Sequence, residues 1–213
     1  MVTTIDIKDI VSEAVCRYYL SSRRRSDDST KISVSEALQC LRRSFYDRTN
    51  PMCSINIASM EIGTAVHRAV LERLADYGFV IEVPVSKRYG DVTIVGRVDA
   101  YHPDLDVIIE LKVVSKKVDE PPKEHMAQVS IYMDIVGCRR GYIAYLSTDP
   151  RKPLWVYEVR KNRHLVDWVV ERARKLSHHL REGTEPLPEP SPLCAFCPYA
   201  SMCKPLLRRK RFK

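Results

Sequence analysis

Side-chain amides are scarce in this sequence of 213 residues, since Asn50, Asn56, Asn162, Gln39 and Gln128 are the only ones it contains. Asn and Gln are thermally labile, so their scarcity indicates a thermophilic source. Long apolar runs are also missing, because no stretch approaches the roughly eighteen residues of a membrane-spanning helix. There is no signal peptide either. From these absences we expect a soluble cytoplasmic protein that binds no membrane.

The composition is that of a globular protein, with 45% hydrophobic and 29% charged residues. The length suits one domain with a real core and a small appendage. The formal net charge of +8 favours a polyanionic partner. The seven cysteines are many for an intracellular chain, and in that setting they indicate metal or redox chemistry rather than a disulfide framework.

Hydrophobic periodicity predicts an α/β fold. The first helices are expected near residues 5–20, 33–47 and 57–77, where Ser33 and Glu36 form a capping box that starts the second. The later elements are listed in chain order: strands at 80–87, 92–100 and 107–114, a helix at 122–136, strands at 142–147 and 154–159, and a helix at 162–182. This order predicts a mixed sheet flanked by helices.

Residues 96–114 read as a β-hairpin, because two β-branched runs flank the turn 102–106. A turn centred between Asp104 and Leu105 pairs residues whose numbers sum to 209, which places Asp99 opposite Glu110. Lys112 then shares their face, since side chains alternate along a strand. The opposite face is expected to carry three apolar side chains, those of Val98, Leu111 and Val113.

Two carboxylates about 5 Å apart repel each other unless a cation lies between them. Oxygen ligands of this kind suit Mg²⁺ or Mn²⁺. The alternative is a pair of charges on a solvated hairpin face. The apolar run 107–109 argues against that alternative, because it indicates a strand buried on both faces.

Two other helices carry candidate polar residues. His67 lies one step off the apolar stripe of its helix, a stripe that includes Ile62. Gln128 and Tyr132 are four residues apart and share a helix face. From the residues alone, the default interpretation of His67, Gln128 and Tyr132 is a structural role.

A second cluster lies near the C-terminus, where Cys194, Cys197 and Cys203 have the spacing of chelating thiolates. A closed site needs a fourth ligand. The candidates are distant cysteines: Cys16, Cys40, Cys53 and Cys138. An arrangement of three neighbouring cysteines and one distant cysteine, with Cys197 followed by Pro198, favours an iron–sulfur cluster. A zinc site is the alternative. The basic tail 204–213 follows the cluster and is suited to binding phosphates.

Five short segments and the cysteines occur in a fixed order along the chain: GTAVH at 63–67, GRVDA at 96–100, ELK at 110–112, Gln128, Tyr132, and the triad Cys194, Cys197 and Cys203. Together they resemble the RecB-type nucleases of the PD-(D/E)XK superfamily. The short length and the cysteine layout resemble the CRISPR-associated RecB-like exonucleases in particular. The resemblance covers residues from about 40 to 203.

The resemblance implies a role for each matching residue. The metal ligands would be His67, Asp99, Glu110 and the Leu111 carbonyl, around Mg²⁺ or Mn²⁺. Lys112 would be the catalytic lysine. The residues of the adjoining motif helix would be Gln128 and Tyr132, and the cluster ligands would be Cys40, Cys194, Cys197 and Cys203. Cys53 remains the runner-up to Cys40, because Leu41 stands where family members often have proline.

The resemblance also implies an architecture and an activity. An N-terminal helical region (1–56) would supply one cluster cysteine, followed by a nuclease core (57–182) and a C-terminal cysteine cluster with its basic tail (183–213). An iron–sulfur subdomain, with a 4Fe–4S cluster in preference to 2Fe–2S, would join the N-terminal helices to the C-terminus. The expected activity is 5′-to-3′ exonucleolytic cleavage of single-stranded DNA or DNA ends, with CRISPR integrase proteins as partners in spacer acquisition and antiviral defence. The alternatives are a RecB-like repair nuclease outside CRISPR systems and a non-catalytic DNA-binding adaptor.

Overall fold

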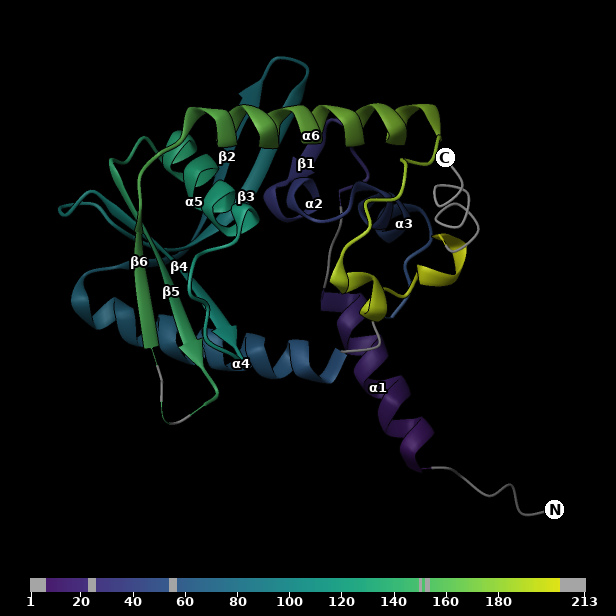
Figure 1. The fold of residues 1–213 in the computed structure, drawn as a ribbon, viewed down its shortest axis with the longest axis horizontal. Helices are drawn as coiled ribbons and strands as arrows, with labels where there is room; N and C mark the ends of the chain where they lie inside the picture. The colour runs from purple at the N-terminus through teal and green to yellow at the C-terminus, as the bar shows by residue number, and fades with distance from the viewer. Residues whose placement is uncertain (1–6, 23–25, 54–56, 150, 152–153, 204–213) are drawn as a thin grey trace.

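The computed structural model describes residues 7–22, 26–53, 57–149, 151 and 154–203 (Figure 1). The basic tail 204–213 lies outside the described residues. The elements up to the central hairpin are α1 (Ile7–Ser22), β1 (Lys31–Ser33), α2 (Val34–Leu38), α3 (Leu41–Thr49), α4 (Ile57–Leu74), η1 (Ala75–Tyr77), β2 (Val80–Tyr89), β3 (Val92–His102) and β4 (Val107–Val114). The remaining elements are α5 (Lys123–Val136), β5 (Arg140–Ser147), β6 (Leu154–Val159), α6 (Arg163–Glu182) and η2 (Pro192–Phe196).

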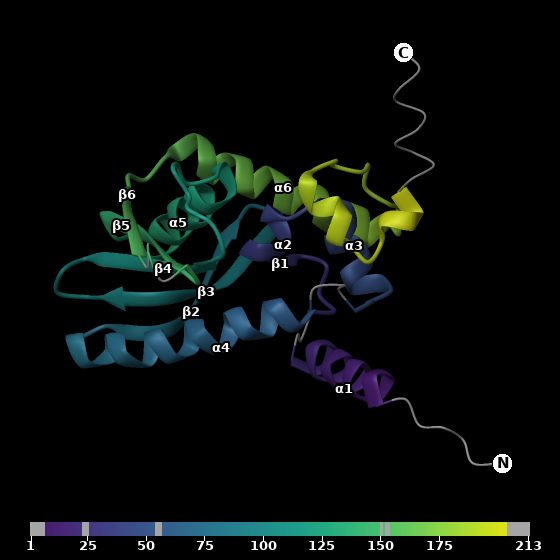
Figure 2. The ribbon, with the colours of Figure 1, turned by 60° about the horizontal axis from the view of Figure 1, so that its bottom comes forward.

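A six-stranded mixed sheet forms the centre of the fold, in the order β1-β3-β4-β5-β6 with β2 on the other edge of β3. The pairs β1–β3 and β4–β5 are parallel, and the remaining pairs are antiparallel. Figure 2 shows α4 on one face of the sheet and α5 with α6 on the other. The predicted α/β class with a mixed sheet between helices is therefore confirmed.

The two faces of the sheet bury cores of unequal size. The larger core lies under α5 and α6 and includes Ile94, Val98 and Ile143. The smaller core lies under α4, where Leu71 packs against Leu111 and its neighbours on the sheet. None of the helices in the described part of the chain has the length and apolar character needed to span a bilayer.

Strand β3 has a gap in its hydrogen bonding along one edge. Its other edge is covered by β2, which pairs with it from Val92 to Tyr101. On the edge in question, β1 pairs with residues 93–95 and β4 pairs with residues 100–102. Residues 96–99 between them have no strand partner there among the described residues. We call this segment the fork, because β1 and β4 diverge from it.

The alternation of side chains changes face at the fork. Val98 belongs to the core under α6, whereas Ala100 two residues later belongs to the core under α4. On the neighbouring strand, Glu82 faces this point and has a φ of 50°, which reverses the pleat there. The prediction that Val98 and Leu111 share a face is therefore wrong, because strict alternation does not continue through this bend.

The predicted single helix over residues 33–47 is two helices, α2 and α3, with Gln39 and Cys40 between them. Arg172 of α6 donates to the carbonyl oxygens of Ala37 at 2.6 Å and Gln39 at 2.7 Å. These bonds satisfy oxygens that a continuing helix would have used. The capping box of Ser33 and Glu36 is confirmed at the start of α2. Cys40 is thus the residue before α3 rather than a residue within a helix.

The C-terminal segment 183–203 packs on α3, as the yellow ribbon beside α3 in Figure 1 shows. Tyr199 is buried and donates to Asp47 of α3 at 3.0 Å. Cys16 of α1 forms a disulfide with Cys53. The cysteines therefore do not all serve metal or redox chemistry as predicted, because two of them join α1 to the segment after α3.

Candidate active site

The hairpin brings Asp99 and Glu110 together as predicted. Ala100 pairs with Ile109, so the paired residues have numbers that sum to 209. Asp99 and Glu110 follow directly, where β3 and β4 begin to diverge at the fork. In place of a backbone bond across the strands, the Leu111 N–H donates to Asp99 Oδ2 at 2.8 Å. This bond fixes the Asp99 carboxylate at the end of the ladder.

Helix α4 carries His67 to the same point. The His67 Nε2 atom lies 2.9 Å from Asp99 Oδ2. The hydrogen bond to this carboxylate raises the pKa of His67, and burial of the ring opposes the effect. The helix packs on the sheet through Leu71, one turn after His67, whereas Ile62 is exposed. The buried face is therefore rotated from the predicted stripe and includes His67.

Glu110 is the most deeply buried carboxylate at the site, with 3% of its surface exposed. Its Oε1 atom accepts from Lys112 Nζ at 2.6 Å. Its Oε2 atom is buried and has no hydrogen-bond partner among the residues that the structure describes. Burial raises the pKa of Glu110 to about 7, with a further increase from Asp99, although Lys112 opposes it. A buried carboxylate oxygen without a donor is costly, and a cation beside this oxygen would offset the cost.

Helix α5 completes the site with Gln128 and Tyr132. Lys112 donates to Gln128 Oε1 at 2.8 Å, so the lysine lies between Glu110 and the helix. Tyr132 is buried against the fork, and burial, followed by the charge of Glu110, raises its pKa. The structure therefore brings together all seven residues of the predicted nuclease site: His67, Asp99, Glu110, Leu111, Lys112, Gln128 and Tyr132.

The side chains available for a divalent ion are the imidazole of His67 and the carboxylates of Asp99 and Glu110. Across the described part of the chain, no three His, Cys, Asp or Glu side chains converge on one point as they would around an ion. At this site His67 is hydrogen-bonded to Asp99, and Glu110 is hydrogen-bonded to Lys112. The unpartnered Glu110 Oε2 and the oxygen-rich donor set nevertheless fit Mg²⁺ or Mn²⁺.

Gly96 in the fork allows Tyr132 to approach the sheet. A Cβ atom at this position would lie 2.6 Å from Tyr132 Cε1. We expect Gly96→Ala to lower the free energy of unfolding by about 1–3 kcal/mol and to displace Tyr132, because the ring has to move. Urea unfolding measures the loss. The matched control is Gly63→Ala in α4, where a Cβ has open space and the change should be neutral or stabilising. Equal effects of the two substitutions would contradict this account of Gly96.

His125 is a neighbour of the site that the sequence analysis did not single out, because a lone histidine in a helix gives no signal. Its Nδ1 atom lies 2.8 Å from the hydroxyl of the buried Tyr145. Tyr145 is paired with Lys112 across β4 and β5. Burial and then the charge of Lys112 lower the pKa of His125 to about 4. The ring is therefore neutral at neutral pH.

This shift predicts an acid-dependent loss of stability. The unfolded chain takes up a proton on His125 below a pH of about 6.5, whereas the folded chain does so only near pH 4. Stability is thus lost as the pH falls through this window, by about 2 kcal/mol at pH 5. We expect His125→Gln to remove this part of the loss in urea unfolding at pH 7 and pH 5. His178→Gln, at an exposed position on α6, is the control and should leave the loss unchanged.

The four predicted cluster cysteines lie in one region of the protein. Cys40 precedes α3, and the C-terminal segment carries Cys194, Cys197 and Cys203. Burial raises the pKa of the Cys197 thiol, and the proximity of Cys40 and Cys194 adds to the increase. Burial also raises the pKa of the Cys203 thiol, with additions from Cys40 and Cys197. Cys40 therefore lies with the triad.

The other candidates for a fourth ligand lie elsewhere or are engaged. Cys138 follows α5 and its thiol contacts the Arg140 carbonyl at 3.7 Å. Cys53, the runner-up to Cys40, is bonded to Cys16. Among the candidates, Cys40 is thus the cysteine that the structure places beside the triad.

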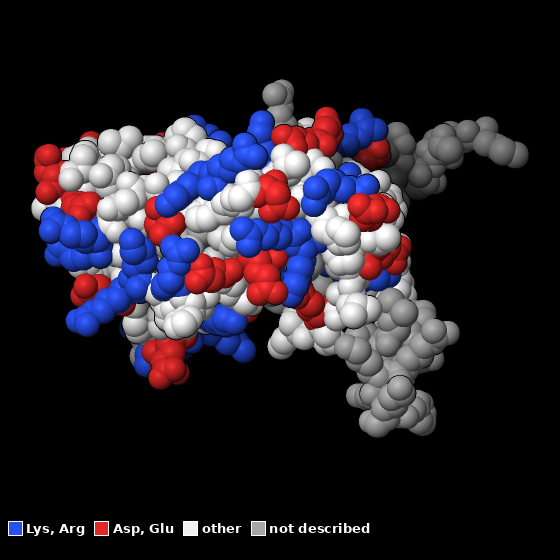
Figure 3. Space-filling view, turned by 90° about the horizontal axis from the view of Figure 1, so that it is seen from above, with Lys and Arg blue, Asp and Glu red and all other residues white. Residues whose placement is uncertain are grey.

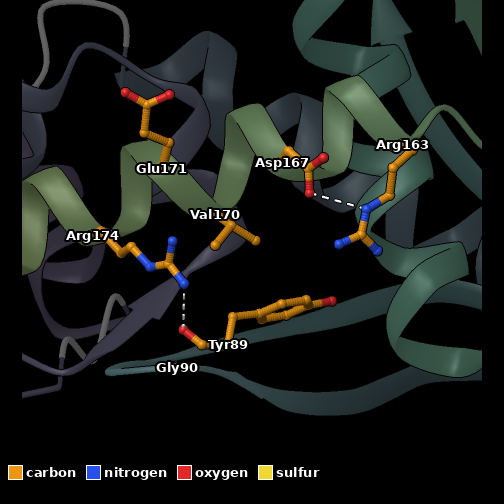
Figure 4. A pocket seen from close by; sticks show the side chains of 7 residues that line it. All are labelled: Tyr89, Gly90, Arg163, Asp167, Val170, Glu171 and Arg174. Carbon is orange, nitrogen blue, oxygen red and sulfur yellow. Dashed lines mark hydrogen bonds and ion pairs between the residues drawn. The ribbon is translucent and has the colours of Figure 1, made fainter.

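A pocket of about 530 Å³ lies between α6 and the β2–β3 turn, and its lining includes none of the residues of the predicted nuclease site (Figure 4). Its two arginines are engaged: Arg163 pairs with Asp167 at 3.0 Å, and Arg174 pairs with Asp91 at 3.3 Å. The surface over α6 likewise carries basic and acidic side chains interspersed (Figure 3). This face therefore presents no single-sign platform for a polyanion, despite the basic net charge.

Comparisons with known proteins agree with this arrangement. The family model of the PD-(D/E)XK nuclease superfamily matches residues 14–204. The crystal structure of SSO0001 superposes with a TM-score of 0.69 at 19% identity, covering 94% of this chain and 98% of that one. A search of curated protein sequences gave no match.

Two further similar structures are those of an exonuclease. The alkaline exonuclease LHK-Exo from Laribacter hongkongensis superposes with a TM-score of 0.55 at 14% identity, covering 78% of this chain and 93% of that one. The structure of LHK-Exo in complex with dAMP superposes with the same TM-score of 0.55 at 15% identity, covering 72% of this chain and 89% of that one. At these identities the superpositions establish a shared fold.

Proposed function

The chain belongs to the PD-(D/E)XK nuclease superfamily, and on that basis we propose that it is a metal-dependent exonuclease acting on the ends of single-stranded DNA. One observation carries the proposal: Glu110 Oε2 is buried without a hydrogen-bond partner in the described residues, beside the Asp99–His67 pair. A carboxylate is kept in such a place at a cost in stability, and a divalent ion offsets that cost. A purely structural role would not explain why Glu110 Oε2 is buried without a hydrogen-bond partner in the described residues.

The residues of the site have separate tasks in this proposal. His67, Asp99 and Glu110, with the Leu111 carbonyl, would hold Mg²⁺ or Mn²⁺, which lowers the pKa of a coordinated water and offsets charge on the scissile phosphate. Lys112 is held between Glu110 and Gln128, so its ammonium group is positioned to stabilise the charge that develops on the phosphate. Tyr132 fixes the position of α5 against the fork and with it Gln128.

We further propose that Cys40, Cys194, Cys197 and Cys203 hold an iron–sulfur cluster, 4Fe–4S in preference to 2Fe–2S. The support is their grouping in one region and the engagement of Cys53 elsewhere. Sulfur ligands of a multi-iron cluster stand further apart than the ligands of one ion, so the lack of a tight three-ligand group in the described residues is compatible with it. The cluster would tie the C-terminal segment to α3.

The biological role that we propose is trimming DNA ends in the 5′-to-3′ direction before their integration as CRISPR spacers, with integrase proteins as partners. This role rests on the resemblance of the motifs and of the cysteine layout. The fold shared with LHK-Exo is equally compatible with a nuclease outside CRISPR systems.

The activity is tested with single-stranded DNA labelled at the 5′ or the 3′ end and incubated with Mn²⁺, Mg²⁺ or EDTA. The proposal expects progressive, metal-dependent shortening of linear DNA, with early release of the 5′ label. Circular single-stranded DNA of the same sequence is the matched substrate control, because it has no end. Cleavage of the circle at the rate of the linear form, or cleavage in EDTA, would contradict an exonuclease of this kind.

A further inference from the structure

Two consecutive arginines, which follow Cys40 and Leu41, have little exposed surface at the start of α3. Arg42 has 5% of its surface exposed, and the side chain of Arg43 has 18% exposed. Burial of a guanidinium group is costly unless it is paired and hydrogen-bonded. Two adjacent guanidinium groups, one buried and one partly buried, therefore need partners in their immediate surroundings.

The partners of Arg42 account for only part of its donors. Its Nη1 atom donates to the Pro186 carbonyl at 2.9 Å, and its Nη2 atom donates to the Tyr46 hydroxyl at 2.9 Å and to Glu185. These bonds hold the two terminal nitrogens against the C-terminal segment. The Nε atom is buried and has no hydrogen-bond partner in the described residues.

Arg43 likewise has a donor nitrogen without a hydrogen-bond partner in the described residues. Its Nε atom is buried without a hydrogen-bond partner among the residues that the structure describes, and it lies 3.8 Å from Asp47 Oδ2, beyond hydrogen-bonding distance. A buried donor left unsatisfied costs about 1–3 kcal/mol. Two such donors in one helical turn indicate acceptors that the oxygens of the described residues do not supply.

The neighbours of both arginines are the cysteines of the proposed cluster. Arg42 lies close enough to Cys203 for its positive charge to act on that thiol. Arg43 lies close enough to Cys197 for its charge to act there. The two guanidinium groups thus act on different cysteines of one group.

We propose that Arg42 and Arg43 are positioning residues for the cluster, which donate N–H···S hydrogen bonds to its sulfur atoms and set its reduction potential; this rests on the cluster put forward above. Hydrogen bonds and positive charge at the sulfurs stabilise the form with more electrons. Reduction adds one electron from an external donor such as dithionite, and no bond forms or breaks. The arginines therefore raise the potential.

The test is a dithionite titration of the reconstituted protein, followed by the visible absorbance of the cluster, in parallel with an iron assay. Arg43→Lys keeps the charge and removes the Nε donor, whereas Arg43→Gln removes both. We expect Arg43→Gln to make reduction at least tenfold less favourable, a downward shift of about 59 mV for one electron. Arg43→Lys should shift the potential in the same direction by less. Arg42→Lys should lower it as well.

The matched control is Arg48→Lys. Arg48 is buried in the same region, but it pairs with Glu36 at 2.7 Å. Its variant should retain the wild-type potential. If the wild type holds no iron, the proposed cluster fails and this inference fails with it. If the wild type holds the cluster and the Arg42, Arg43 and Arg48 variants share its potential, the inference alone is overturned.

Discussion

Glu110→Gln should lower the metal-dependent cleavage rate by at least about 10³-fold while making the metal-free protein more stable above neutral pH. The loss follows from the removal of a ligand charge at the ion, where a single electrostatic contact is worth about 10²–10³ in rate and metal affinity falls as well. The gain follows from burial, because the Glu110 carboxylate is 3% exposed and has one oxygen without a donor in the described residues. Gln keeps the shape and removes the charge.

The pH dependence separates this account from a general loss of structure. The pKa of Glu110 is raised to about 7 in the folded protein by burial, so the folded chain holds a proton that the unfolded chain releases near pH 4.5. Stability conferred by this proton is present below that pH and is lost as the pH rises to about 7. The metal-free wild type should therefore lose stability through this window, and Glu110→Gln should lose less. Thermal unfolding at pH 5 and pH 8, without and with Mn²⁺, measures both.

Two results would count against this role of Glu110. One is a Gln variant that cleaves DNA at the wild-type rate. The other is a variant that loses activity and is also less stable than the wild type at pH 8, because that result would make Glu110 a structural residue. The control is Glu72→Gln on the exposed side of α4, where Glu72 pairs with Arg68 at the surface. It should change neither activity nor stability appreciably.

Cys40→Ser should abolish iron binding and lower the free energy of unfolding by about 3–5 kcal/mol, since a cross-link that closes a long loop is removed. Cys40 and Cys194 are separated by most of the chain, and the segment 183–203 otherwise depends on contacts such as that of Tyr199 with Asp47. Loss of the cluster would leave the connection between α3 and this segment to such contacts alone. Iron analysis, visible absorbance and urea unfolding of the anaerobically purified protein give the three readouts.

The matched control is Cys53→Ser, measured under reducing conditions. Cys53 is bonded to Cys16 and so is not a free thiolate, and this variant should therefore keep its iron and its absorbance. The reverse outcome, with iron retained in Cys40→Ser and lost in Cys53→Ser, would make Cys53 the fourth ligand. Retention of iron in both variants would contradict the proposed set of ligands.

The centre of the fold could be predicted from the sequence because local signals fixed it. The turn at 102–106 set the register of the hairpin, which in turn placed Asp99 next to Glu110. Gly78 and Gly137 end their helices with positive φ, a conformation that glycine adopts readily after the last turn of a helix. Sequence separations of four likewise placed Gln128 and Tyr132 on one face of α5.

What the sequence did not reveal depends on contacts between distant segments. The break before α3 is stabilised by Arg172, which lies more than a hundred residues away. Strand β1 has only three residues, too few for a periodic pattern. The change of face at the fork depends on the positive φ of Glu82, a non-glycine residue for which composition gives no indication. The buried face of α4 depends on where the helix lies on the sheet.

The central claim is that His67, Asp99 and Glu110 hold one divalent ion, and Mn²⁺ binding to wild type and Asp99→Asn tests it most directly. The free Mn²⁺ signal in electron paramagnetic resonance gives stoichiometry and affinity without any need for activity. Asn retains an oxygen that can accept from the Leu111 N–H, so the fold should persist. We predict one tightly bound ion per wild-type chain and at least a tenfold weaker affinity in the variant. Equal affinity and stoichiometry in the two proteins would contradict the claim.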